Sequence, residues 1–318
     1  DDLEGRIIHL ADYGGFLKTL PYDKDGHGTH VAATVLGNGI LSGSNPQLRK
    51  YDGSYAGAAP EAKLVFQALG DEQGSLWIHP PDPIGEKLFL PAYTLGARVH
   101  SNSWGTVDAV FHGVYLSWSQ EVDAFTTNHK DMVIVFAAGN DGSQSQYGTV
   151  IPPSTAKNGL SIGGVDTRNP NTVLSWSSKG YTQDGRVKPD LLAPGSYIVS
   201  ARSSTAIRPC SQPTNPSYCV FSGTSMATPN VAGLAALTRE YFLQYPKVQQ
   251  PSAALVKATL INGADAVGFP KPSREAGWGR VNISNSLPVD QTDLFFADES
   301  QGLRTTEQKT YRLFVAAG

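Results

Sequence analysis

Apolar and polar positions follow two spacings along the chain, and these predict strands and helices in alternation. Residues 132–138 and 160–165 are apolar runs without polar alternation, typical of strands buried on both faces of a parallel sheet. A helical spacing of apolar residues begins after His27 and ends near residues 37–39. Strands alternating with helices predict an α/β fold with a mostly parallel central sheet. The same patterns predict further strands at 6–10, 62–69, 99–104 and 197–201, and helices at 84–96, 110–128, 225–245 and 252–263.

The end of the chain follows a different pattern. Residues 293–297 and 310–316 are strand-like, and no helical spacing separates them. We therefore expect residues 1–287 to form one α/β domain and residues 288–318 to be the incomplete start of a C-terminal β domain. The chain opens on Asp1 without a methionine or a signal sequence, which indicates a processed product or a lost start.

Composition narrows the class of protein. Of the 318 residues, 40% are hydrophobic and 17% are charged, which suits a compact protein with a substantial core. The net charge of −3 and the lack of a long basic tract argue against nucleic-acid binding. No apolar run approaches the roughly 18 residues that a membrane helix needs.

The two cysteines, Cys210 and Cys219, flank a loop that contains Pro213 and Pro216. A disulfide closing this loop is favoured over two free thiols, because the spacing matches no zinc or redox motif. A disulfide would imply an oxidising compartment.

Ser225 lies at the predicted start of a helix, after Gly223 and before small residues. A serine there can be an ordinary N-cap. It can also be a nucleophile, because the helix dipole and its own backbone N–H stabilise a developing oxyanion. A serine hydroxyl becomes a good nucleophile only when a nearby base takes its proton.

His27 is flanked by two glycines, which would leave its ring accessible to a substrate. Taken alone, such a histidine is more often a surface or core residue than a catalytic base. His30 lies three positions further on, but no other histidine completes a ligand spacing, so we expect no metal at this pair.

Asn140 follows the buried strand that ends at Ala137, Ala138 and Gly139. Its amide can donate a hydrogen bond into a cleft, or it can be a plain turn residue. The segment Ser103, Trp104 and Gly105 also ends a strand, either as a simple terminus or as an edge that pairs with an extended peptide.

The ordered set His27-Gly-Thr-His-Val-Ala, Asn102-Ser-Trp-Gly, Ala137-Ala-Gly-Asn and Gly223-Thr-Ser-Met-Ala-Thr-Pro resembles the subtilisin-like serine proteases, or subtilases. The resemblance covers roughly residues 1–285. It implies a subtilisin-like three-layer fold and, in the family branch that the tail resembles, a C-terminal β-sandwich.

The resemblance also implies a secreted serine endopeptidase that acts on polypeptide substrates. Ser225 would be the nucleophile, His27 the general base, and Asn140 with the Ser225 N–H the oxyanion hole. The two walls of the P1 pocket, which holds the side chain before the scissile bond, would be Ser103, Trp104 and Gly105 on one side and Ala137, Ala138 and Gly139 on the other. The family needs no cofactor for catalysis, although calcium often stabilises it, and Gly/Asp-rich loops offer oxygen ligands.

One residue of the family pattern is missing. Subtilases carry the triad aspartate at the end of an apolar strand well before the histidine, but only 26 residues precede His27. Residues 1–5 resemble the stretch that follows this acid, so we expect the acid upstream of Asp1, on an upstream segment that could stay bound. Asp12, in Asp-Tyr-Gly, is a weaker alternative because 15 residues leave too little chain before His27, and Asp23 and Asp25 are expected to be solvated turn residues.

The alternatives that remain differ in class. A catalytically inactive subtilase-like domain could bind peptides without cleaving them. An α/β-hydrolase esterase is disfavoured, since that family needs Gly-x-Ser-x-Gly and places its histidine after the serine. If the acid is upstream, residues 1–318 alone should be poorly stable and nearly inactive.

Overall fold

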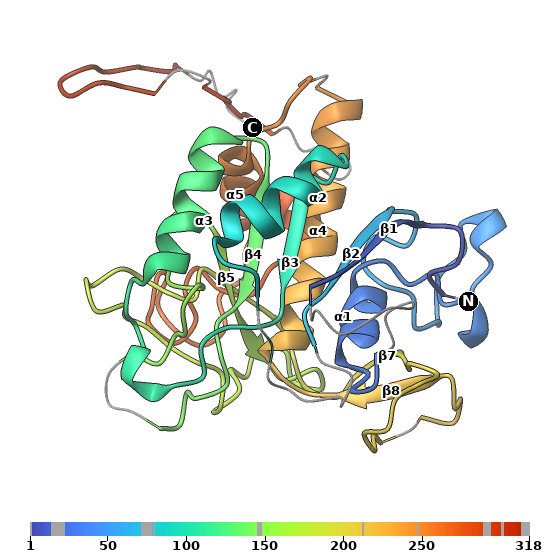
Figure 1. Cartoon of the computed structure of the whole chain (residues 1–318). Helices are drawn as coiled ribbons and strands as arrows, with labels where there is room; N and C mark the ends of the chain where they lie inside the picture. Colours follow the sequence, from blue (N-terminus) through green and yellow to red (C-terminus); the bar gives the residue numbers. More distant parts are fainter. Residues whose placement is uncertain are drawn as a thin grey trace.

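A four-stranded parallel sheet forms the centre of the computed structural model (Figure 1). The structure describes residues 2–13, 23–70, 78, 80–144, 148–211, 213–246, 248–288, 294–299 and 302–312. The sheet has the order β3 (Val99–Asn102), β4 (Val133–Ala137), β5 (Leu160–Val165) and β6 (Leu191–Pro194). All three pairings are parallel, so the predicted α/β class with a parallel sheet is confirmed.

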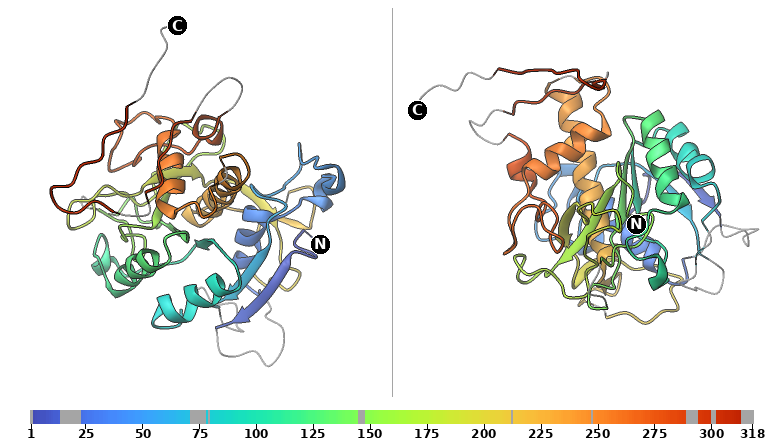
Figure 2. Two further views of the ribbon diagram at one scale, coloured as in Figure 1. Left: turned by 90° about the horizontal axis from the view of Figure 1, so that it is seen from above. Right: turned by 90° about the vertical axis from the view of Figure 1, so that its left-hand side faces the viewer.

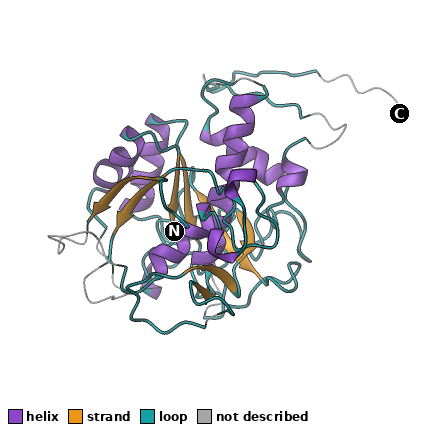
Figure 3. Cartoon of the chain, turned by 90° about the vertical axis from the view of Figure 1, so that its right-hand side faces the viewer, coloured by secondary structure: helices purple, strands orange, loops and turns teal. Residues whose placement is uncertain are grey.

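Helices cover both faces of this sheet and produce three layers, which are seen edge-on in Figure 3. On one face α4 (Thr224–Gln244) and α5 (Ala253–Asn262) pack on Val133, Val135 and Ile162. On the other face α3 (Ser117–Asn128) and α2 (Leu90–Thr94) cover Ile134 and Phe136 (Figure 2). Because adjacent strand residues point to opposite faces, the unbroken apolar run of β4 serves both layers.

Two smaller sheets flank the central one. β1 (Ile7–Asp12) pairs in parallel with β2 (Leu64–Ala68), and β7 (Ile198–Ala201) pairs antiparallel with β8 (Tyr218–Phe221). Helix α1 (His27–Leu36) packs against α4. Figure 1 shows β2 between β1 and the edge strand β3 of the central sheet, yet β2 and β3 are not paired.

Several predicted elements begin or end elsewhere. The helix predicted at 110–128 starts at Ser117, since Gly113 turns the chain with a φ of 73° after a short 3₁₀ helix. The helix predicted at 84–96 is a π-helix, Gly85–Phe89, continued by α2. Strand β6 was not predicted. The short helices of the described chain are Ile40–Ser42, Pro46–Leu48, Ala109–Phe111 and α6 (Ile283–Ser286).

The tail lies against the α4 and α5 layer. Phe296 packs edge-on against Phe242 of α4, and the Asp298 carboxylate accepts hydrogen bonds from the Ser252 backbone N–H and hydroxyl at the start of α5. Residues 294–299 and 302–312 form no strand, so the strands predicted at 293–297 and 310–316 are wrong for their described residues. Each lacks a partner strand there to complete its backbone hydrogen bonds. The boundary at residue 288 and the further β domain stay predictions.

Over the described residues, none of the helices combines the length and the apolar character needed to cross a membrane.

Candidate active site

Ser225 is the second residue of α4, which places its backbone N–H among those that have no carbonyl partner inside the helix. Gly223 precedes the helix with a φ of 156° and a hydrogen bond from its N–H to the Gly195 carbonyl. This conformation suits glycine, and it turns the chain from β8 into α4 within a few residues. The Ser225 side chain is half-buried at the mouth of the turn.

The Ser225 carbonyl is held by a side chain from a distant segment. Pro229 lies four residues on inside α4 and has no N–H, so it cannot supply the usual helical bond to this carbonyl. The Ser103 hydroxyl donates to it instead at 2.8 Å, and the Ser225 hydroxyl donates to the Ser103 carbonyl at 3.3 Å. This reciprocal pair fixes one predicted wall of the P1 pocket to the predicted nucleophile.

Asn140 is oriented by Thr224. Its Oδ1 atom accepts from the Thr224 backbone N–H at 2.9 Å and from the Thr224 hydroxyl at 3.1 Å. A backbone N–H can only donate, so this contact assigns Oδ1 to Thr224 and leaves Nδ2 as the free donor of the amide. An amide held in this way presents its N–H groups to the cavity that Asn140 lines.

His27 is the first residue of α1, and Asp23 anchors the turn before it. The Asp23 carboxylate accepts from the Gly26 N–H at 2.9 Å and the Thr29 N–H at 2.6 Å, and Asp25 pairs with Arg208 at 3.2 Å. The expectation that Asp23 and Asp25 are merely solvated turn residues is therefore wrong, because unpaired N–H groups at a helix start recruit acceptors.

Burial lowers the pKa of His27 below its ordinary value, although the charges of Asp25 and Asp23 act in the opposite direction. These carboxylates act on the ring through their charge and not through a hydrogen bond. In the described part of the chain, then, no hydrogen-bonded carboxylate orients the imidazole.

His30 has a structural role. Its Nε2 atom lies 3.1 Å from the Ile198 carbonyl and 3.2 Å from the Cys219 carbonyl, and its ring stacks on Phe221. Burial lowers the pKa of His30 to about 4, so the ring is neutral at ordinary pH. Among the described residues, no group of three or more His, Cys, Asp or Glu side chains is placed to hold a metal ion.

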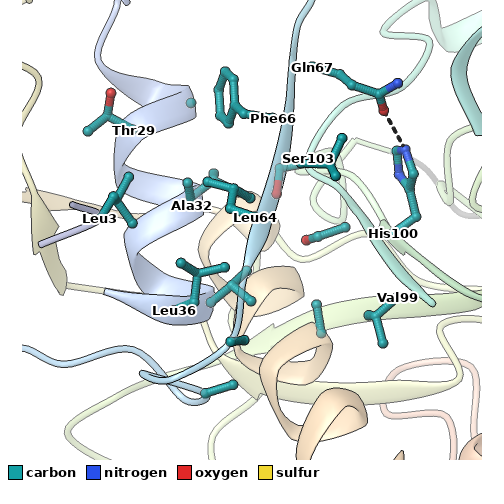
Figure 4. Close-up of a pocket in the computed structure, with 18 of the residues that line it drawn as sticks. Leu3, Thr29, Ala32, Leu36, Leu64, Phe66, Gln67, Val99, His100 and Ser103 are labelled. Carbon is teal, nitrogen blue, oxygen red and sulfur yellow. Dashed lines mark hydrogen bonds between the residues drawn. The ribbon is translucent and has the colours of Figure 1, made fainter. Parts of the chain in front are cut away.

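The three predicted catalytic residues line one cavity of about 2500 Å³. The cavity lies between β2 and β3 and is bordered by α1 and α4 (Figure 4). Figure 4 labels lining residues from these elements: Thr29, Ala32 and Leu36 of α1, Leu64, Phe66 and Gln67 of β2, and Val99, His100 and Ser103 of β3 and the loop after it.

Five of the six predicted wall residues also line this cavity: Ser103, Trp104, Gly105, Ala137 and Gly139. Ala138 does not, because it is fully buried with its N–H bonded to the Ile162 carbonyl. The Trp104 ring packs edge-on against Phe136 and anchors its wall to the core. The sequence analysis missed Ile151, which also lines the cavity.

Strand β3 carries polar side chains that line the cavity: His100, Ser101 and Asn102. Gln67 of β2 donates from Nε2 to the Leu88 carbonyl, so its Oε1 accepts from His100 Nε2 at 2.8 Å. The buried Ser101 Oγ has no hydrogen-bond partner in the described chain, whereas the His100 and Asn102 side chains interact with each other. Buried polar atoms without a partner are rare in folded proteins.

Asp12 also lines the cavity, but it lies on β1, with β2 between it and β3. Its partner across the strand pair is Ala68.

Cys210 and Cys219 form a disulfide, as predicted. Cys219 belongs to β8, and Phe221 at the end of the same strand stacks on His30 of α1. The bridge therefore stabilises the part of the molecule that supports the His27 helix.

Comparison with known proteins defines the class. A family model described as the subtilase family matches residues 16–279, and the chain belongs to that family of subtilisin-like serine proteases. It is 34% identical over 307 residues to serine protease AprX of Bacillus subtilis (strain 168), covering 90% of this chain and 63% of the relative. It is 30% identical over 271 residues to thermitase of Thermoactinomyces vulgaris, covering 84% of this chain and 76% of thermitase.

Solved structures share the fold. The prenylagaramide maturation protease PagA matches with a TM-score of 0.62 at 22% identity, over 87% of this chain and 85% of that one. The self-cleaved protease domain of PatA matches with a TM-score of 0.60 at 23% identity, over 87% and 86%. These likenesses confirm the predicted subtilisin-like fold. The chain spans 63% of the length of AprX and 20% of the Dictyostelium discoideum protein tagD, which it matches at 28% identity.

Proposed function

We propose that the protein is a serine endopeptidase in which Ser225 is the nucleophile and His27 the general base. The observation that carries this proposal is the single cavity lined by Ser225, His27 and the oriented amide of Asn140. In this reading the Ser225 hydroxyl attacks the scissile carbonyl while His27 takes its proton. His27 then gives that proton to the leaving amine.

Two donors would stabilise the tetrahedral intermediate. Asn140 Nδ2 is left free by the Thr224 contacts, and the Ser225 N–H is free at the start of α4. Donors fixed before the reaction need no reorganisation as the oxyanion develops, which is why they lower the barrier.

We further propose that the triad acid lies on a strand between β2 and β3, contributed by residues that precede Asp1 in the longer protein. Three observations support it: the break in the sheet, the buried Ser101 hydroxyl on β3 that has no partner in the described chain, and the lowered pKa of His27. An extended strand in this gap could pair with β2 on one side and with β3 on the other. A carboxylate bonded to the imidazole would raise the pKa of His27 and hold its tautomer.

The test compares three proteins: residues 1–318, the longer native protein, and its Ser225→Ala variant as the control. We expect the longer protein to hydrolyse peptides and residues 1–318 to be roughly 10⁴-fold slower, the loss that removal of a triad acid produces. The pH–rate profile of the longer protein should report a higher histidine pKa than the imidazole titration of residues 1–318.

Two results would contradict parts of this proposal. If residues 1–318 match the longer protein, the acid lies within them, and Asp12→Asn then tests the leading alternative. If a fluorophosphonate fails to label Ser225 in the longer protein, the domain is a subtilase-like peptide-binding module without catalysis.

The substrates and the location of the protein are part of the same proposal. We propose polypeptide substrates and an oxidising, extracellular location, which the Cys210–Cys219 disulfide supports. Catalysis by these residues needs no cofactor, and structural calcium stays a prediction.

A further inference from the structure

The turn that presents His27 is covered by a second segment of the chain, residues 203–208. The Ile207 N–H of this segment donates to the Lys24 carbonyl of the turn at 2.8 Å. A backbone hydrogen bond between segments so far apart in the sequence fixes their relative position. Residues 203–208 therefore support the turn immediately before the proposed general base.

Two further contacts join the same segment and turn. The Ser203 hydroxyl donates to the Asp23 carbonyl at 2.7 Å, and an atom added at Gly26 would lie 3.2 Å from Ala206 Cβ. The segment follows β7 and ends two residues before Cys210, which is bonded to β8. Both ends of the segment are thus tied to the β7–β8 sheet.

Arg208 brings a positive charge to this turn. Its Nη1 atom lies 3.2 and 3.4 Å from the two carboxylate oxygens of Asp25, which stands two residues before His27. The Asp25 side chain is only 13% exposed, and a mostly buried carboxylate is costly to leave unpaired. The guanidinium also lies 5.5 Å over the Phe221 ring of β8, which orients it toward the turn.

Burial has the largest effect on the His27 ring and lowers its pKa. The charges of Asp25 and Asp23 on the turn favour the protonated ring, whereas the charge of Arg208 disfavours it. His30 of α1 also interacts with the ring, but it is neutral at ordinary pH. The proposed triad acid would add a negative charge from the upstream strand. Within the Arg208–Asp25 pair, therefore, the two charges act on the imidazole in opposite directions.

We propose that Arg208 is a positioning residue for the general base, which acts by holding the Asp25 carboxylate and balancing its charge beside His27. This inference rests on the proposed endopeptidase function and adds to it a residue that no sequence motif marks. Without Arg208, the unbalanced carboxylate would keep a proton on the imidazole at a higher pH. A protonated imidazole is unable to take the proton of Ser225.

The experiment measures kcat/KM of the longer native protein against pH with a peptide p-nitroanilide. The midpoint of the acid limb reports the pKa of the general base in the free enzyme. Arg208→Gln should raise this midpoint by about 0.5 pH unit, and Asp25→Asn should lower it by about as much, since each change leaves one charge unbalanced. The double variant should lie within about 0.2 pH unit of wild type, because it removes both charges.

Three further measurements separate charge from support of the fold. Arg208→Lys should keep the wild-type midpoint, because one nitrogen of Arg208 makes both contacts and a point charge can replace it. The shifts should shrink by at least half in about 1 M NaCl, since the Arg208 side chain is 44% exposed. The matched control is Arg186→Gln. Arg186 also pairs with an aspartate, Asp184, at 2.8 Å, but it is not among the charges of the described chain that act on His27, so the midpoint should stay unchanged.

Failure of this inference is distinguishable from failure of the proposed function. An active wild type whose single variants keep the wild-type midpoint, or shift it in the same direction, overturns the inference alone, even if their Tm values fall. The midpoint comes from the active molecules, so a partly unfolded variant still reports it. A wild-type protein with no hydrolysis and no fluorophosphonate labelling of Ser225 overturns the proposed function and the inference with it.

Discussion

The hydrogen bond between Ser103 and the Ser225 carbonyl yields a prediction about the stability of the active-site turn. Ser103→Ala removes the side-chain donor to this half-buried carbonyl, and Pro229 has no N–H to replace it. Pro229→Ala restores a backbone N–H at residue 229, the position from which a helix normally donates to the carbonyl of residue 225. It should therefore recover part of the stability that Ser103→Ala removes.

The magnitude follows from the nature of the group that is left unpaired. Loss of a typical hydrogen bond costs about 0.5–1.5 kcal/mol, and the cost is about 1–3 kcal/mol where a buried acceptor is left unpaired. The carbonyl is only partly buried, so we expect Ser103→Ala to lower the free energy of unfolding by about 1.5 kcal/mol. In the Pro229→Ala background the same change should lower it by about 0.5 kcal/mol, a coupling of about 1 kcal/mol.

Urea denaturation of the four proteins of this cycle measures the coupling. All four carry Ser225→Ala, which prevents self-digestion but keeps the carbonyl at residue 225. If the effects of Ser103→Ala and Pro229→Ala on the free energy of unfolding add to within about 0.5 kcal/mol, the reasoning is refuted, since only independent sites behave in that way. The matched control is Ser42→Ala, which removes a hydroxyl bonded to the Gly39 carbonyl far from α4 and should show no coupling to residue 229.

Three further predictions concern other parts of the molecule. Replacing Cys210 and Cys219 by serine should lower the free energy of unfolding by about 3 kcal/mol, from the entropy of the short loop they close, and calorimetry should find Tm about 4 °C lower. Lys188→Met removes the 2.6 Å partner of the buried Asp190 carboxylate, which keeps Lys257 at 3.0 Å, and should destabilise the protein by about 2 kcal/mol in urea; an unchanged midpoint would contradict this. Asn140→Ala in the full-length protein should lower kcat by about 10²–10³ with KM little changed, and a larger effect on KM than on kcat would exclude an oxyanion role.

The sequence predicted best those elements whose pattern is local and long. The apolar run at 132–138 became β4, and the helix predicted at 225–245 is Thr224–Gln244. Strand β6 escaped prediction because Pro189 precedes it and Pro194 ends it, and proline argues against a strand. The strand forms nonetheless because these prolines lie before it and at its end, while its middle pairs with β5 on one side and, at Leu192, with residues 279–281 on the other.

Sequence motifs identified the candidate catalytic residues, but not the other residues that line the cavity. His27, Asn140 and Ser225 each stand in a short motif that the family resemblance interprets. Ile151 carries no such mark, since its place beside the cavity arises only when the fold brings Gly105 and Gly139 to either side of it. The strands predicted in the tail are wrong for a related reason. A strand forms only where a neighbouring strand edge can pair with it, and the described tail residues pack against helices instead.

The gap between β2 and β3 runs beside helix α1, which carries His27 as its first residue. Val31, Val35 and Leu36 of α1 line the same cavity, so the cavity extends along the helix. Both ends of α1 are nonetheless packed. An atom added at Gly28 would lie 3.0 Å from the Phe66 ring of β2, and one added at Gly233 of α4 would lie 3.1 Å from the Val35 carbonyl. Because α1 is already held in place, the proposed strand would act on His27 chiefly through its carboxylate, which would hold the imidazole and its tautomer.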